Sequence, residues 1–198
     1  MAKIKLDIDT LEKYIHYSLK IAQNDAPLAG VFCCSVIELL GRFLRIHTIT
    51  ISKDRRVHFP GDKWFYDFIE KYLKNRSEKY FEQRLVLWKL LRCESAHAVL
   101  ATTAITWSNA DWIKLHHLTG HNDPRANRKS LLIWTSRFVQ DVDDAVSNFF
   151  IDVKKDKSLE NNCQKSFLEM YNYGQNIIKK EIGRKVLKIE SEGEISIG

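Results

Sequence analysis

The sequence predicts an all-α protein. Across most of its 198 residues, apolar side chains recur every three or four positions, which is the period of a helix. Only 3 prolines and 8 glycines interrupt this pattern, and both residue types weaken or end helices. With 44% hydrophobic residues, the chain can bury a core of its own. We therefore expect one helical domain over residues 1–182, followed by a C-terminal tail at 183–198 that is a loose strand or disordered.

The first two helices are expected at about 7–23 and 27–46. Pro27 suits the first turn of the second helix, because its missing N–H would have no partner there. The positions that follow the helical period are Leu11, Ile15, Leu19 and Ala22 in the first helix, and Val31, Cys34, Ile37, Glu38 and Phe43 in the second.

An irregular connector or small hairpin is expected between His47 and Gly61. Apolar and polar residues alternate in HTITIS, a basic DRR follows, and HFPG ends the segment. Such alternation beside turn-forming residues is typical of a short hairpin or an exposed loop. Two further helices are expected after it, at about 62–74 and 77–99. The first of them carries five aromatic residues, which at helical spacing favour a core role over the stacking of bases: Trp64, Phe65, Tyr66, Phe68 and Tyr72.

Three more helices are expected in the C-terminal half. A short one lies between 108 and 124 and is ended by Gly120 and Pro124. A long one covers about 127–150, and a last one covers about 158–182. The apolar positions of the long helix are Leu131, Ile133, Trp134, Phe138, Val142, Val146 and Phe149.

Charge and cysteine content limit the class of protein. A net charge of +6 and a pI near 9.1 permit nucleic-acid binding, and ordinary surface charge explains them equally well. No apolar run approaches the roughly 18 residues of a membrane span, and the N-terminus does not resemble a signal peptide. We expect a soluble cytoplasmic protein whose cysteines are reduced core residues: Cys33, Cys34, Cys93 and Cys163.

The segment LLRCESAH, residues 90–97, carries the most suggestive chemistry. It places Arg92 and His97 five residues apart within an apolar helical pattern. Arginine is always charged and binds phosphate oxygens in a forked geometry, and histidine exchanges protons near neutral pH. Such a pair could cut RNA without a metal, because the 2'-hydroxyl of the substrate can attack its own phosphate.

Spacing alone does not single out this pair. The same interval separates Arg42 from His47, where the basic cluster looks like charge complementing a helix C-terminus. In a straight helix, Arg92 and His97 also point about 140° apart. They can therefore share a target only across a bend or a helix end, or at the two-fold axis of a homodimer.

The context of the motif resembles the HEPN (higher eukaryote and prokaryote nucleotide-binding) superfamily, in particular bacterial members with an RCxxxH motif. The resemblance covers about residues 35–150. Its parts are SVIELLGRF at 35–43, WFYDFIEKYL at 64–73, LVLWKLLRCESAH at 85–97 and FVQDVDDAVSNFF at 138–150. It implies a small helical bundle that forms a homodimer.

The resemblance also implies a function. Many HEPN proteins are metal-independent ribonucleases, in which His97 would be the general acid or base and Arg92 would bind and neutralise the scissile phosphate. A toxin system or phage defence would be the setting, with an antitoxin or other regulatory protein as a partner. Active members commonly have Asn, Asp or His after the arginine, and this chain has Cys93. The alternative is a noncatalytic HEPN-like module that binds RNA or a partner protein.

Structural roles for these residues remain open. Arg92 could pair with Glu38, Glu94 or another carboxylate, and we favour Glu38, since an unpaired buried carboxylate is costly. His97 could then be a hydrogen-bonded residue between helices.

Further phosphate contacts are expected from two basic segments, although each is also typical of a solvated loop. These are DRR, with Arg55 and Arg56, and ANRK, with Arg128 and Lys129.

No metal or cofactor is expected. Glu94 and His97 form a single ExxH, whereas a di-iron bundle needs two. A zinc site built from Cys93 and His97 with His117 and His121 is conceivable, but Gly120 interrupts the second pair. The chain also lacks GxxxxGK, GxGxxG after a strand, and GxSxG, so nucleotide triphosphatase, dinucleotide and hydrolase-elbow chemistry have no support.

Overall fold

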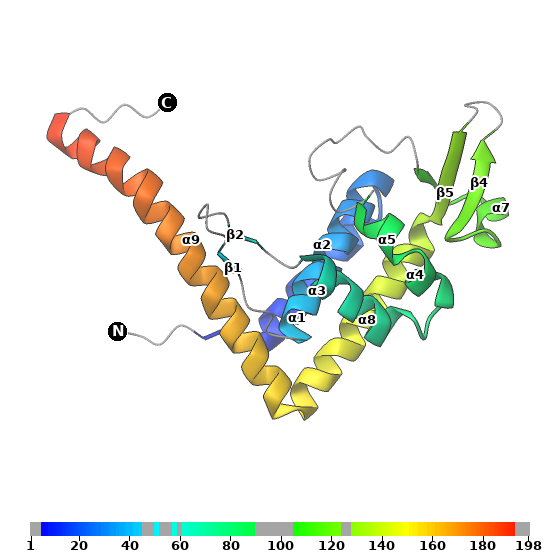
Figure 1. Ribbon diagram of the computed structural model, residues 1–198, viewed down its shortest axis with the longest axis horizontal. Coiled ribbons are helices and arrows are strands. Elements are labelled where there is room, and N and C mark those ends of the chain that lie inside the picture. The colour runs from blue at the N-terminus through cyan, green and yellow to red at the C-terminus, as the bar shows by residue number, and fades with distance from the viewer. Residues whose placement is uncertain are drawn as a thin grey trace.

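The computed structural model shows a mostly helical chain with two small sheets (Figure 1). It describes residues 5–44, 50–51, 57–58, 61–89, 105–123 and 128–192, and at 27, 50–51, 57–58, 112, 121–123, 128–129 and 179–192 it describes the backbone alone. The helical elements are α1 (Ile8–Ala22), α2 (Ala26–Leu44), α3 (Gly61–Phe68), η1 (Ile69–Leu73), α4 (Glu78–Glu82), α5 (Arg84–Val86), α7 (Asp111–Lys114), α8 (Thr135–Lys155) and α9 (Lys157–Glu192). The strands are β1 (Thr50–Ile51), β2 (Val57–His58), β3 (Ile105–Ser108), β4 (Thr119–Asp123) and β5 (Arg128–Trp134).

The N-terminal helices form where the sequence predicts them. Asp7 caps α1 by accepting a hydrogen bond from the backbone N–H of Thr10 at 3.1 Å, which satisfies a free donor of the first turn. On the inner face of α1, Ile15, Leu19 and Ala22 are buried, and Leu11 packs against the core. The predicted connector contains the β1–β2 hairpin, which pairs Thr50 with His58 and Ile51 with Val57.

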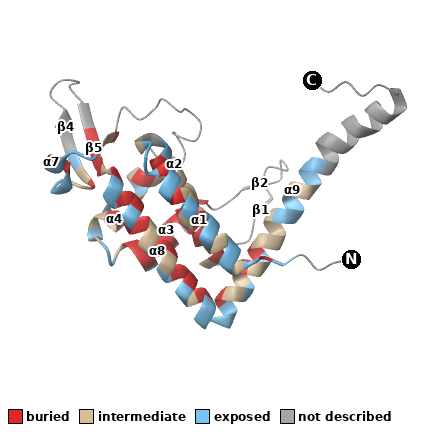
Figure 2. Cartoon of the chain, turned by 180° about the vertical axis from the view of Figure 1, so that it is seen from behind, coloured by how far each residue is buried: buried red, intermediate tan, exposed pale blue. Residues whose placement is uncertain are grey.

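The core lies where α2, α3 and α8 meet, and the buried residues gather there (Figure 2). Phe149 of α8 contacts both other helices, with ring centroids 6.4 Å from Phe43 and 6.1 Å from Phe68. Gly41 lets α2 approach α3 closely, because a Cβ atom at this position would overlap the carbonyl oxygen of Trp64. The aromatic residues of α3 and η1 belong to the core, as predicted: Trp64, Phe65, Phe68 and Tyr72 are buried, and Tyr66 packs against the core.

The C-terminal half departs from the predicted helices. Residues 128–134 form β5 rather than the start of a helix, and α8 begins at Thr135. β5 is the middle strand of a sheet, parallel to β3 and antiparallel to β4. Its apolar run buries Leu131, Leu132 and Ile133, and such a run is compatible with either a buried helix or a buried strand. Gly120, expected to end a helix, lies within β4.

Two predicted helices also have different bounds. The helix expected at 77–99 is interrupted at Gln83, whose φ of −93° and ψ of 5° separate α4 from α5. The last helix runs from Lys157 to Glu192, so residues 183–192 of the expected tail continue α9 instead of forming a strand or disordered chain. α8 and α9 meet at Asp156, whose carboxylate accepts from the N–H groups of Ser158 and Leu159, and they diverge from there (Figure 1).

Cys33, Cys34 and Cys163 are buried, as predicted for core cysteines. Cys93 lies outside the described residues. Burial raises the pKa of the Cys163 thiol to about 12, so this thiol is not a nucleophile at neutral pH. None of the helices in the described part of the chain is both long enough and apolar enough to span a membrane.

Candidate functional site

The motif itself lies outside the described residues. This holds for Arg92, Cys93, Glu94 and His97, and also for Arg55 and Arg56. Arg128 and Lys129 occupy the start of β5, opposite Asp123 and Asn122 of β4, where the backbone alone is described. Their predicted roles therefore remain predictions.

The last described residues before the motif lie near Glu38. A Cβ atom on Gly61 would lie 2.7 Å from Oε1 of Glu38 and 2.8 Å from the indole of Trp88, so both side chains close around the start of α3. Trp88 also packs on Phe65, with ring centroids 5.3 Å apart. Glu38 is partly buried in this aromatic surrounding. Arg92 follows Trp88 by four residues and lies outside the described residues, so its pairing with Glu38 stays a prediction.

Arg42, from the second pair with this spacing, has a structural role. Arg42 lies in the last turn of α2, as the reading of a complemented helix C-terminus predicts. Its guanidinium is 5.0 Å from the ring of Trp64 and 3.5 Å from the carboxylate of Glu169 in α9. Arg42 therefore links α2 to α3 and α9. His47 lies outside the described residues.

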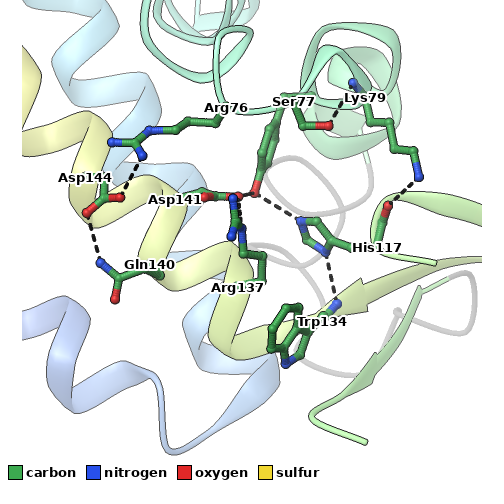
Figure 3. Close-up of polar contacts among 10 residues, drawn as sticks. Arg76, Ser77, Lys79, His117, Trp134, Arg137, Gln140, Asp141 and Asp144 are labelled. Atoms are coloured by element: carbon green, nitrogen blue, oxygen red, sulfur yellow. Dashed lines mark hydrogen bonds and ion pairs between the residues drawn. The ribbon is translucent and has the colours of Figure 1, made fainter. Parts of the chain in front are cut away.

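A buried polar network joins α4, the α7–β4 turn and α8 (Figure 3). The hydroxyl of Tyr80 donates to Oδ2 of Asp141 at 2.9 Å, and Nε of Arg137 donates to the same oxygen at 2.9 Å. The ring of His117 lies 3.1 Å from the Tyr80 hydroxyl through Nε2. Its Nδ1 accepts from the backbone N–H of Trp134, also at 3.1 Å. The network thus ties the sheet to the helices.

These bonds fix the protonation state of His117. Because the N–H of Trp134 donates to Nδ1, the neutral ring carries its proton on Nε2 and donates it to Tyr80. Burial, the largest influence, lowers the pKa of His117 to about 4. Burial and then the Asp141 carboxylate raise the pKa of Tyr80 well above its usual range. Neither group is therefore suited to exchange protons near neutral pH.

No family model, no curated protein and no solved structure gives a significant match to this sequence.

A pocket of about 260 Å³ opens next to the network. It lies between α4, α7, the end of β5 and the start of α8. Four of its lining side chains are cationic, namely Arg76, Lys79, Lys114 and Arg137, and one carboxylate, that of Asp141, also lines it. We refer to it below as the basic pocket.

A second histidine cluster has the order of a hydrolytic triad. His16 of α1 contacts Oδ1 of Asp143 through Nδ1 at 2.5 Å and the hydroxyl of Ser147 through Nε2 at 3.5 Å. However, Ser147 donates to the backbone carbonyl of Asp143 at 3.2 Å. Both residues lie inside α8, where the backbone N–H groups are used by the helix and cannot stabilise an oxyanion. The cluster therefore serves to join α1 to α8.

No group of three or more potential metal-binding side chains occurs among the residues that the structure describes. His117, one of the four residues considered as zinc ligands, has both ring nitrogens hydrogen-bonded within the network. For His121 the structure describes the backbone alone.

Neither the buried network nor the basic pocket is predicted from the sequence. One signal was present, because Asp141 falls on the apolar face of α8 between Phe138 and Ala145, and a carboxylate on such a face needs partners. The partners themselves come from distant segments that pattern reading does not bring together.

Proposed function

We propose that this chain is a HEPN-like protein that cleaves RNA without a metal, through Arg92 and His97. The proposal is carried by the place of the motif in the chain. Trp88 and Glu38 both lie next to Gly61 at the start of α3, and Arg92 is three residues beyond Lys89, a stretch of at most about 11 Å. The three other segments of the resemblance lie mainly in helices, α2, α3 with η1, and α8, which supports the proposal without testing it.

The reaction needs only the substrate and two side chains. A base removes the proton of the 2'-hydroxyl, whose oxygen then attacks the adjacent phosphorus, and the bond to the 5'-oxygen breaks as that oxygen gains a proton. His97 acts as general base or general acid, and Arg92 neutralises the charge on the phosphate. The products carry a 2',3'-cyclic phosphate and a 5'-hydroxyl.

A homodimer belongs to this proposal. Arg92 and His97 diverge on a straight helix, so a two-fold axis that brings two copies of the motif into one cleft would complete the site. We also propose a cytoplasmic protein held in check by an antitoxin or another regulatory protein. Cys33 and Cys163 are buried and form no disulfide, which fits a reducing compartment.

Cleavage by chelator-treated protein tests the proposal. The parent should produce fragments with cyclic phosphate ends, and His97→Ala should lower the cleavage rate at least about 100-fold. The matched control is His47→Ala, the histidine of the second match, which should retain the parental rate. Equal cleavage by parent and His97→Ala protein would contradict the proposal.

The second candidate is a noncatalytic HEPN-like module that binds RNA or a partner protein. Cys93 favours it, because a thiol is a weak hydrogen-bonding group at the position where active HEPN ribonucleases commonly have Asn, Asp or His. Binding of RNA that weakens steeply with salt, without any cleavage, would support this candidate. The absence of both RNA binding and a stable complex with another protein would contradict it.

A further inference from the structure

Lys79 and Arg137 of the basic pocket are held by hydrogen bonds to the protein, and each has further N–H groups that these bonds do not use. Nζ of Lys79 donates to the carbonyl of His117 at 3.3 Å and to the hydroxyl of Thr119 at 3.0 Å, which uses two of its three N–H groups. Arg137 is bound to Asp141 through Nε, and its side chain is 45% exposed. Within the described residues, its two terminal nitrogens bind no protein group. These donors are therefore fixed in position and not used by the described residues.

Arg76 adds a third anchored cation at the rim. One of its terminal nitrogens lies 3.0 Å from the carboxylate of Asp144, and the side chain is about one-third exposed. Asp144 stands outside the pocket lining, so the remaining N–H groups of Arg76 can bind an anion. An arginine that already holds a carboxylate loses less conformational entropy when it binds a phosphate, since its side chain is fixed beforehand.

Asp141 contributes little negative charge to the pocket. It is only 2% exposed and receives two hydrogen bonds, one from the cation of Arg137 and one from Tyr80. His117 stays neutral above a pH of about 4 because burial lowers its pKa. The charged side chains that line the pocket are therefore mainly cations, two of which also contact carboxylates outside the lining, Arg76 that of Asp144 at 3.0 Å and Lys114 that of Asp111 at 2.5 Å.

An aromatic ring stands beside these cations. Trp134 ends β5 and is partly exposed. Its position is fixed because its backbone N–H is bound to His117. Lys114 lies with its Nζ 5.5 Å from the centroid of the indole ring. An indole surrounded by lysine and arginine is the arrangement by which proteins bind single-stranded nucleic acid, with the base on the ring and the phosphates on the cations.

We infer that the basic pocket binds one nucleotide of a single-stranded RNA, with its base against Trp134 and its phosphates against Arg76, Lys79 and Arg137. The volume of about 260 Å³ lies just below the range of small-molecule pockets, so it admits one unit of a strand that continues outside. This inference rests on the proposed RNA-directed function. It adds a site for substrate that shares no residue with the motif at 92–97.

Binding of a 2'-O-methyl oligouridylate tests the inference without cleavage, because the attacking hydroxyl is blocked. The full chain is titrated with a fluorescein-labelled ten-nucleotide strand at several salt concentrations. Replacing both Arg76 and Lys114 by Gln should raise the dissociation constant at least about fivefold at low salt and make its salt dependence shallower. The control, Lys13→Gln with Lys165→Gln, removes the same charge outside the pocket and should change the constant less than about twofold.

Trp134→Phe provides a second measurement. Binding of the oligouridylate to the parent should quench tryptophan fluorescence, and the quench should shrink sharply in this variant. Equal dissociation constants for the pocket variant and the control, or no binding by the parent at low salt, would overturn the inference. Cleavage of unmodified RNA, compared between the parent and His97→Ala, is scored separately. The proposed function can therefore stand while the basic pocket fails.

Discussion

The hydroxyl of Tyr80 donates a hydrogen bond of 2.9 Å to Asp141, and both side chains are almost completely buried. A buried carboxylate is tolerated only when its charge is compensated and its oxygens are hydrogen-bonded. Tyr80 supplies one hydrogen bond from α4, and Arg137 supplies the cation from α8 itself. The hydrogen bond therefore joins α4 to α8 through two residues that are 61 positions apart in the chain.

Tyr80→Phe should lower the free energy of unfolding by about 2–3 kcal/mol, because a hydrogen bond to a buried charged group is lost and His117 loses an acceptor. Urea denaturation followed by circular dichroism measures the change. Tyr17→Phe is the matched control, since its ring is 64% exposed, and its effect should stay within about 0.5 kcal/mol. Similar midpoints for the two variants would show that the Tyr80 bond contributes little.

His117 should make the protein less stable in mild acid. Its pKa is about 4 in the folded chain and about 6.5 in the unfolded chain, so between these values the unfolded chain binds a proton that the folded chain does not. The free energy of unfolding therefore falls as the pH drops from 6.5 to 4, by at most about 3 kcal/mol. Above pH 6.5 this histidine has no such effect.

Urea unfolding at several pH values, with His117→Gln beside the parent, checks this expectation. The variant loses two hydrogen bonds and starts from a lower stability, but its free energy of unfolding should change less with pH between 4 and 6.5. His116→Gln, at an exposed neighbouring position, should keep the pH dependence of the parent. A parental slope in His117→Gln would exclude His117 as its source.

Two glycines should respond in opposite directions to replacement by alanine. At Gly41 a Cβ atom would overlap the carbonyl oxygen of Trp64, so Gly41→Ala must separate α2 from α3 and should cost about 2 kcal/mol or more. At Gly174 in α9, a Cβ atom would meet nothing within 4 Å. Gly174→Ala should therefore stabilise the helix by about 0.5–1 kcal/mol. Thermal melts of both variants measure the difference, and a neutral Gly41→Ala would contradict the close approach.

Helical period was sufficient to place α1, α2 and the aromatic helix of α3 and η1, because each has one apolar stripe that faces the core. It failed at residues 131–134, LLIW, where a run buried in the middle of a sheet has no period of its own. It also ended the last helix early, since Gly183 looks like a stop signal but lies inside α9.

The two candidate sites differ in whether they can be predicted from the sequence. Arg92 and His97 are close in the chain, so their chemistry is visible as a motif. The basic pocket draws Lys79 from α4, Lys114 from α7 and Arg137 from α8. Only the tertiary packing places these charges together, and no local pattern marks them.

The pairing of Glu38 with Arg92 should appear as a coupling energy in a double-mutant cycle. Glu38 is partly buried, and its carboxylate lies at Gly61 beside the ring of Trp88, where a charge gains from a cationic partner. We expect Glu38→Gln, Arg92→Gln and the double variant to give a coupling of at least about 1 kcal/mol in urea unfolding. The control cycle combines Arg92→Gln with Glu82→Gln. Because Glu82 is exposed, this cycle should give a coupling near zero.

The same cycle separates the two proposed functions when cleavage is measured beside stability. If Arg92 contacts the scissile phosphate, Arg92→Gln must reduce cleavage far more than its loss of stability explains, and Glu38→Gln must reduce it moderately by releasing Arg92 from its position. If Arg92 serves only to neutralise Glu38, the coupling energy is large and the parent shows no cleavage to lose. A coupling near zero in both cycles would mean that Glu38 is satisfied by another group, and the predicted pairing would be wrong.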